Sequence, residues 1–119
     1  MRDFKTLVVW QKAHQVALRI YKATADFPKE EIYGLTSQIR RAASSVPANI
    51  AEGCGRNGDV ELGRFCHIAM GSASEVEYFL ILATDLELID RSVYDSLNND
   101  LVEMKRMLNA FIQKLKANS

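Results

Sequence analysis

Apolar and small side chains recur at alternating spacings of three and four residues through the segment 60–88. The members of this series are Leu62, Phe65, Ala69, Ser72, Val76, Phe79, Ala83 and Leu86. This rhythm lines one face of an α-helix, whereas a half-buried strand would alternate at every second residue. It predicts a helix roughly 40 Å long whose stripe must pack against other helices. A serine in such a seam indicates close packing, so Ser72 is not interpreted as a nucleophile.

Three further segments have helical periodicity. They are expected at residues 7–26, from Glu30 or Glu31 to Glu52, and from Asp90 or Ser92 to Lys116. The first is predicted to end before Pro28, because the residue that precedes a proline avoids helical geometry. Pro47 lies inside the second, and its missing amide hydrogen predicts a kink. Because apolar spacing continues beyond Pro47, we expect one bent helix rather than two.

Short connections between the four helices predict the fold. The glycine-rich segment 53–58 reads as a tight turn, with Gly53 ending one helix and Asp59 capping the next. No segment reads as a strand. We therefore expect an all-α, antiparallel up-down-up-down four-helix bundle that forms a single domain over residues 1–119.

Two helices carry more apolar surface than one bundle core needs. The first offers a second apolar line at Val9, Val16 and Ala23, and the third offers Ile68 and Leu82. Helices that are apolar on more than one face need a second partner. This surplus predicts a homo-oligomer.

A polar stripe follows the second predicted helix beside its apolar stripe. Its members, Gln38, Arg41, Ser45, Asn49 and Glu52, fall within roughly 80° of the helix circumference. Because the stripe flanks the core, we expect it to form a seam with another helix or chain, with Ser72 and Glu75 as partners. Two interpretations stay open: the seam contacts a partner, or it only sets helix register.

The formal net charge is zero, but the charges are unevenly distributed. Residues 1–58 hold nine Lys/Arg and five Asp/Glu, a net charge of +4, and residues 59–119 hold six and ten, a net charge of −4. Either an assembly has a basic and an acidic surface, or the opposite charges pair across packed helices. The candidate phosphate-binding residues are Lys12, Arg19, Lys22, Arg40 and Arg56. Since most of the aromatic residues occupy predicted core positions, we expect no base-stacking platform, and any RNA or DNA binding would be mainly electrostatic, weakly sequence-specific and sensitive to salt.

Familiar catalytic and cofactor motifs are not supported. Residues 53–58 match G-x-G-x-x-G, but a helix precedes them where a dinucleotide site needs a strand. Cys66 and His67 are adjacent and would point about 100° apart on a helix, so we expect no metal site. We predict no catalytic residue and no cofactor. The alternative is an enzyme with a polar site at a helix or subunit interface, built from Arg41, Glu52, Ser72 and Glu75.

The bulk properties point to the cytoplasm. Two cysteines do not form a disulfide framework, and no secretory signal is visible. The longest strongly apolar run, residues 78–83, is too short to span a bilayer. We therefore expect a cytoplasmic protein without membrane contact.

Several short motifs together resemble a known family. They are Phe4-Lys5-x-Leu7, Val9-Trp10-Gln11-x-Ala13, Phe27-Pro28, Glu31-x-Tyr33-Gly34-Leu35, Gln38-Ile39-Arg40-Arg41-Ala42-Ala43-x-Ser45, Asn49-Ile50-Ala51-Glu52-Gly53 and Ala69-x-Gly71-Ser72-x-x-Glu75. Over nearly the whole chain this set resembles the four helix bundle protein family, also called the 23S rRNA intervening-sequence protein family or S23-like.

The resemblance implies a four-helix bundle that assembles as a homopentamer with a central channel. A related protein is the accessory variability determinant of diversity-generating retroelements, a basic pentamer that partners a reverse transcriptase and binds nucleic acid. The zero net charge of this chain departs from that basic protein. We therefore expect a non-enzymatic, pentameric interaction module whose partner is RNA, DNA or a protein, including one that processes nucleic acid.

Overall fold

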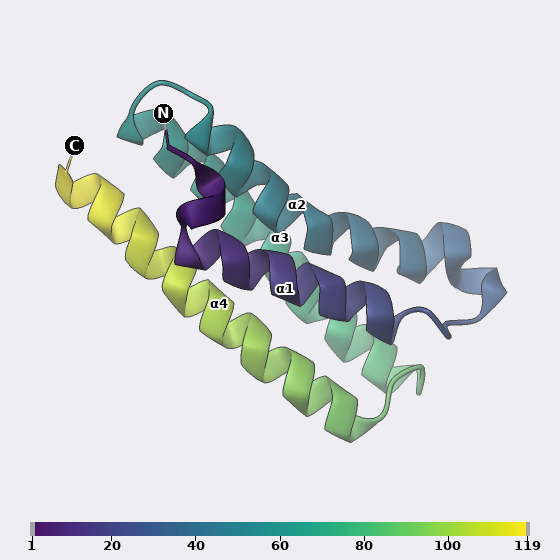
Figure 1. Cartoon of the computed structure of the whole chain (residues 1–119). Coiled ribbons are helices and arrows are strands. Elements are labelled where there is room, and N and C mark those ends of the chain that lie inside the picture. Colours follow the sequence, from purple (N-terminus) through teal and green to yellow (C-terminus); the bar gives the residue numbers. More distant parts are fainter. Residues whose placement is uncertain (1, 119) are drawn as a thin grey trace.

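The computed structural model describes residues 2–118, which form four long helices and no strand (Figure 1). These are α1 (Val8–Ala23), α2 (Ser37–Cys54), α3 (Asp59–Asp85) and α4 (Arg91–Asn118). The prediction of an all-helical four-helix fold is confirmed. The elongated molecule measures 45 × 24 × 20 Å along its principal axes.

Each helix packs against two neighbours, so that α1 and α3 occupy diagonal corners of the bundle. In Figure 1, α1 lies in front and α3 runs behind it. Pairs of contacting residues show that α1 and α4 run in opposite directions. Arg19 of α1 meets Ser96 of α4, while the earlier Lys12 meets the later Asp100.

The periodic positions of α3 supply much of the core. Leu62, Phe65, Ala69, Val76 and Ala83 are all buried, and they face the buried line of α2. Leu86, which continues the sequence pattern, is instead 52% exposed. The reason is that α3 ends at Asp85, and the chain then turns through Glu87, which has a positive φ of 63°.

Two helix boundaries differ from those expected. The first helix ends at Ala23 rather than Asp26, and the buried hydroxyl of Thr24 donates a hydrogen bond to the Ile20 carbonyl at 2.8 Å. The second begins at Ser37 rather than near Glu30, because two short turns precede it. These are η2 (Lys29–Glu31) and the π-type turn η3 (Ile32–Thr36).

Gly34 is the cause of the late start of α2. Its φ of −109° and ψ of −114° are not helical and break the expected helix. The Glu31 carboxylate accepts the Leu35 amide hydrogen at 3.2 Å and so satisfies one donor at the break. Pro47 lies buried inside α2, which continues to Cys54, and the bend expected there stays a prediction.

The surplus apolar surface of α1 is smaller than expected. Val9 and Val16, two of the three residues of its second apolar line, are 5% and 3% exposed, because α1 lies between α2 and α4 and buries them in its own bundle. The argument for oligomerisation from these residues is therefore wrong. Ile68 of α3 does remain 43% exposed.

Candidate interaction surfaces

The predicted polar seam crosses to another helix at one place. Arg41 of α2 donates from Nη2 to Glu75 Oε2 of α3 at 2.9 Å, and to Gln38 Oε1 at 3.2 Å. The Arg41 and Glu75 side chains are about half exposed. This group ties α2 to α3 at the surface, as the sequence predicted for Glu75.

The other seam residues make local contacts. Asn49 Nδ2 donates to the Ser45 carbonyl at 2.8 Å and to Ser45 Oγ at 3.0 Å. Glu52 accepts from Arg56 at 2.8 Å, one turn further along the chain. Ser72 is buried in α3, and among residues 2–118 it shares no hydrogen bond with the α2 seam. The seam is thus three separate groups rather than one network.

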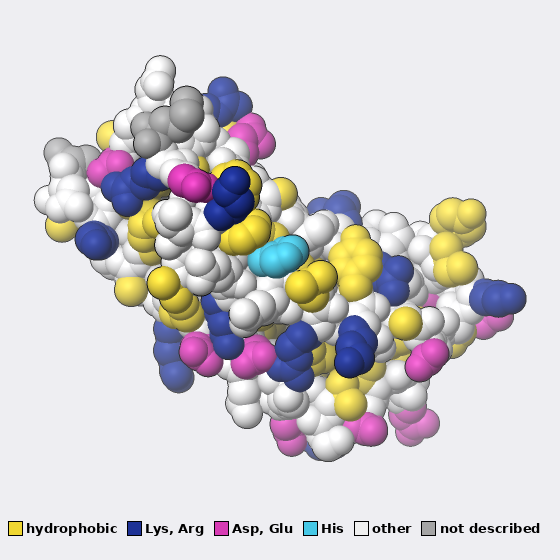
Figure 2. All heavy atoms as spheres, viewed as in Figure 1, with side chains coloured by type: hydrophobic (Ala, Val, Ile, Leu, Met, Phe, Trp, Pro, Cys, Tyr) yellow, Lys and Arg dark blue, Asp and Glu magenta, His cyan; other side chains and the backbone are white. Residues whose placement is uncertain are grey.

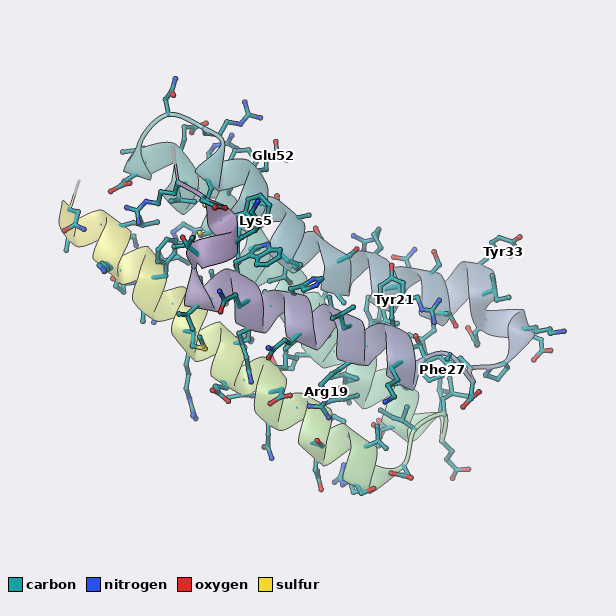
Figure 3. All side chains as sticks on the ribbon, viewed as in Figure 1. Lys5, Arg19, Tyr21, Phe27, Tyr33 and Glu52 are labelled. Carbon is teal, nitrogen blue, oxygen red and sulfur yellow. The ribbon has the colours of Figure 1, made fainter. Side chains whose placement is uncertain are left out.

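Two of the predicted phosphate-binding cations instead join α1 to α4. Lys12 pairs with Asp100 at 3.1 Å and with Glu103 at 3.4 Å. Arg19 also pairs with Asp100 and donates to Ser96 Oγ at 2.7 Å. Figure 3 shows Arg19 pointing from α1 toward α4. Partial burial raises the pKa of Asp100, but the hydrogen bonds from Lys12 and Arg19 outweigh it and hold the pKa below its ordinary value.

Arg40 and Arg56 are also engaged within the chain. Arg40 donates from Nε to Thr24 Oγ1 at 2.8 Å, and its guanidinium lies 4.7 Å from the ring centroid of Tyr21. Arg56 pairs with Glu52. These contacts favour the interpretation in which charges pair inside the bundle over the one in which they form a free basic surface.

An apolar groove runs between α1 and α2, and the sequence pattern did not predict it. Phe4 and Trp10 lie 5.0 Å apart between ring centroids, and Trp10 stacks on His14 at 5.1 Å with only 8° between the ring planes. Leu18 and Tyr21 extend this row along α1 and are 57% and 44% exposed. The expectation that the aromatic residues lie in the core is wrong for this row, although the spacing of four from Trp10 to His14 to Leu18 was a visible signal.

The floor of the groove comes from small residues of α2. Ser44, Pro47, Ala48 and Ala51 line it opposite the aromatic row, and the hollow measures about 410 Å³. Figure 2 shows apolar side chains on both sides of a histidine on this face. In Figure 3, Lys5 and Tyr21 lie toward opposite ends of the strip between α1 and α2. We call this feature the α1/α2 groove.

A second apolar surface lies on the outward side of α3. Tyr78 and Ile81, three residues apart on this helix, are 57% and 43% exposed there, and we call them the α3 ridge. Between residues 65 and 84 the only charged side chains are Glu75 and Glu77. A helix that buries one side and exposes large apolar side chains on the other is typical of a helix that contacts a partner.

Comparison with known proteins decides the family. The model of the 23S rRNA-intervening sequence protein family matches residues 5–110. This chain belongs to the 23S rRNA-intervening sequence protein family. No curated protein matches it.

A solved structure supports the assignment to the 23S rRNA-intervening sequence proteins. It is the crystal structure of a protein of unknown function from the S23 ribosomal protein family of Bacteroides thetaiotaomicron. The two chains are 32% identical and superpose with a TM-score of 0.79, over 88% of this chain and 98% of the other.

The residues of the catalytic alternative do not converge in this 23S rRNA-intervening sequence protein. Glu52 turns to Arg56, Ser72 is buried, and Arg41 and Glu75 form an exposed pair. Within residues 2–118, no three His, Cys, Asp or Glu side chains gather where they could hold a metal ion. Over the same residues, no helix has the length and apolar character needed to cross a membrane.

The two cysteines of this family member are free and buried. Burial raises the pKa of the Cys66 thiol to about 12 and also raises that of Cys54. Since the thiolate is the reactive form, both residues act as small apolar core side chains.

Proposed function

We propose that this protein is a non-catalytic, homo-oligomeric helical bundle, a ring of five copies, that serves as an interaction module. The observation that carries the proposal is the pair of uncovered apolar surfaces, the α1/α2 groove and the α3 ridge. Leu18 in the groove and Tyr78 in the ridge are each 57% exposed. Exposed apolar patches mark contact sites in proteins.

Two separate surfaces favour a ring over a simple dimer. A two-fold dimer covers one patch on each subunit, whereas a ring covers two different patches on every subunit. The groove belongs to α1 and α2 and the ridge to α3, so one contact cannot cover both. The number five rests on the family resemblance.

Light scattering coupled to size exclusion tests the assembly. With 13.4 kDa for each chain, a pentamer has a mass of about 67 kDa. We expect this mass at micromolar concentration, and native mass spectrometry should give the same stoichiometry. A chain that stays monomeric under these conditions overturns the proposal.

Nucleic acid, or a protein that processes it, is the partner class that the resemblance favours for such a ring. Lys12, Arg19 and Arg56 have intramolecular partners, so this part of the proposal depends on assembly bringing several copies to one strand. Structured RNA should shift in a gel at about 50 mM salt and be released as the salt concentration rises. No shift at that concentration rejects RNA as the partner and leaves the assembly standing.

A further inference from the structure

We propose that the α1/α2 groove of one copy receives the α3 ridge of the next copy, so that each subunit contact joins two different surfaces. This inference rests on the proposed self-assembly and specifies how it is built. Its occupant is a second copy of this chain. The argument comes from shape, from charge and from the positions of the two surfaces on the bundle.

The shapes of the two surfaces are complementary. Small side chains, Ala48 and Ala51, floor the groove, and the rings of Trp10 and Tyr21 border it, which leaves a hollow of about 410 Å³. The ridge is convex, because its exposed side chains project from a single helix. Laying an apolar helix face into an apolar groove is a common mode of helix recognition. Two hollows facing each other, or two ridges, would bury far less surface.

The charges also favour contact between unlike surfaces. No carboxylate lines the groove, and Arg40 stacks on Tyr21 at one of its ends. The charged side chains of α3 nearest to the ridge are the acidic Glu75, Glu77 and Asp85. Pairing groove with groove would bring arginines together, and pairing ridge with ridge would bring glutamates together, each of which costs free energy.

The charges influence which surfaces meet, but they are not the main source of affinity between the copies. Glu75 and Glu77 each already pair with a cation of their own chain, Arg41 and Lys105. The apolar contact therefore supplies most of the stabilisation, as is usual for the centre of a subunit interface. The charges select which two surfaces meet.

The positions of the surfaces favour closure into a ring. The groove opens between α1 and α2, while the ridge lies on α3, diagonal to α1. Going round the bundle from groove to ridge crosses α2 alone on one side, but α1 and α4 on the other. The two surfaces are therefore inclined toward the α2 side. When each copy adds to the next through these two surfaces, the row of copies curves toward the α2 side. The row therefore closes into a ring, and α2 of every copy faces the axis of that ring.

A complementation experiment tests the pairing. Ala48→Arg fills the groove and Tyr78→Arg interrupts the ridge, and both positions are exposed, so both variants should keep the helical circular dichroism of the parent. Each variant alone has lost one half of the contact and should be monomeric. An equimolar mixture retains one intact groove and one intact ridge, and it should form a heterodimer of about 27 kDa, twice 13.4 kDa.

Two controls accompany the mixture. Tyr33→Arg makes the same substitution at a tyrosine that is 95% exposed and outside both surfaces, and it should assemble like the parent. Trp10 is the only tryptophan and lies in the groove, so its emission should move to shorter wavelength when the two variants are mixed. The spectrum of either variant alone should not change with concentration.

The remaining outcomes contradict either the proposed assembly or the proposed pairing of groove with ridge. A monomeric parent protein overturns the proposed function and this inference with it. A parent that assembles while Ala48→Arg or Tyr78→Arg also assembles fully overturns the pairing alone, since the groove or ridge then has another occupant or none. Single variants that form dimers show that like surfaces meet. A mixture that stays monomeric overturns the pairing of groove with ridge.

Discussion

The carboxylate of Asp100 in α4 forms an ion pair with Arg19 of α1. The same carboxylate also pairs with Lys12, which precedes Arg19 on α1. One acidic side chain thus pairs with two cations that were predicted from the sequence to bind phosphate. The Lys12 side chain is only 18% exposed, so this cluster belongs to the helix interface as much as to the surface.

Asp100→Asn should lower the free energy of unfolding by about 1–2 kcal/mol at pH 7, because it leaves the partly buried Lys12 with only the exposed carboxylate of Glu103. The pKa of Asp100 is lowered in the folded protein, so its stabilisation is present above the ordinary value of 3.8 and is lost as the pH falls through the folded pKa. The difference between the parent and the variant should therefore vanish in strong acid. Urea denaturation at a series of pH values measures it.

Asp95→Asn is the matched control, since Asp95 is exposed on the same helix and the substitution changes the net charge equally. It should change the stability by at most about 0.5 kcal/mol. Equal effects of the two substitutions would show that the Asp100 cluster adds nothing beyond the general charge.

Gly53→Ala should destabilise the fold by about 1–3 kcal/mol through overpacking between α2 and α3. A β-carbon at this position would lie 2.9 Å from Phe65 Cβ and 3.3 Å from the Leu62 α-carbon, and neither atom can move away freely. Gly63→Ala is the control within a helix, since a β-carbon there meets no atom within 4 Å. That change should raise the stability by about 0.5–1 kcal/mol, because alanine favours the helix. Thermal melts that shift in the same direction for both variants would contradict the close contact.

Thr36→Val and Thr24→Val should have effects of opposite sign. The buried Thr36 hydroxyl has no hydrogen-bond partner among residues 2–118, so replacing it by a methyl group should raise the free energy of unfolding by about 1 kcal/mol. The Thr24 hydroxyl donates to the Ile20 carbonyl and accepts from Arg40, so its loss should cost about 1–2 kcal/mol. Chemical denaturation of the two variants at one protein concentration measures these changes in stability. A loss of stability in both variants would refute the unpaired state of the Thr36 hydroxyl.

Cys54 and Cys66 should not react with a thiol reagent in the folded protein at pH 8. Both are buried, and the pKa of Cys66, at about 12, leaves almost no thiolate at that pH. Asn109→Cys places a thiol at an exposed position of α4 and should react at once. Two reactive thiols should appear in the parent only on unfolding in urea. Fast labelling of the native parent would show that the α2/α3 interface opens readily.

The positions of the helices were largely predictable, because helical periodicity is a local property of the chain. The series from Leu62 to Ala83 lies in the core where the spacing placed it, apart from the half-buried Phe79. The late start of α2 was not predicted, because Gly34 leaves the helical region without a proline or a run of glycines to mark the break. Leu86 was assigned to the core for a similar reason, since the end of α3 interrupts a pattern that continues in the sequence.

The candidate site could be predicted only in part. Arg41 and Glu75 were placed together correctly, because both lie beside the stripe where α2 meets α3. For the cations of α1 the sequence left two interpretations open, a basic surface or ion pairing across helices, since nothing local shows that Asp100 lies opposite them some eighty residues later. The α1/α2 groove was missed because Trp10 and Tyr21 satisfy helical periodicity equally well whether a neighbour covers them or not.

The sequence by itself therefore determined that this chain forms four amphipathic helices, which faces of them are apolar, and the family to which it belongs. Only the tertiary structure decided which apolar faces stay uncovered and which charges are already paired. The physical reason is that periodicity depends on residues three and four apart, whereas burial and ion pairing depend on which helices become neighbours. Val9 and Val16 show the difference, since their own bundle buries them, while Ile68 and Tyr78 on α3 remain exposed.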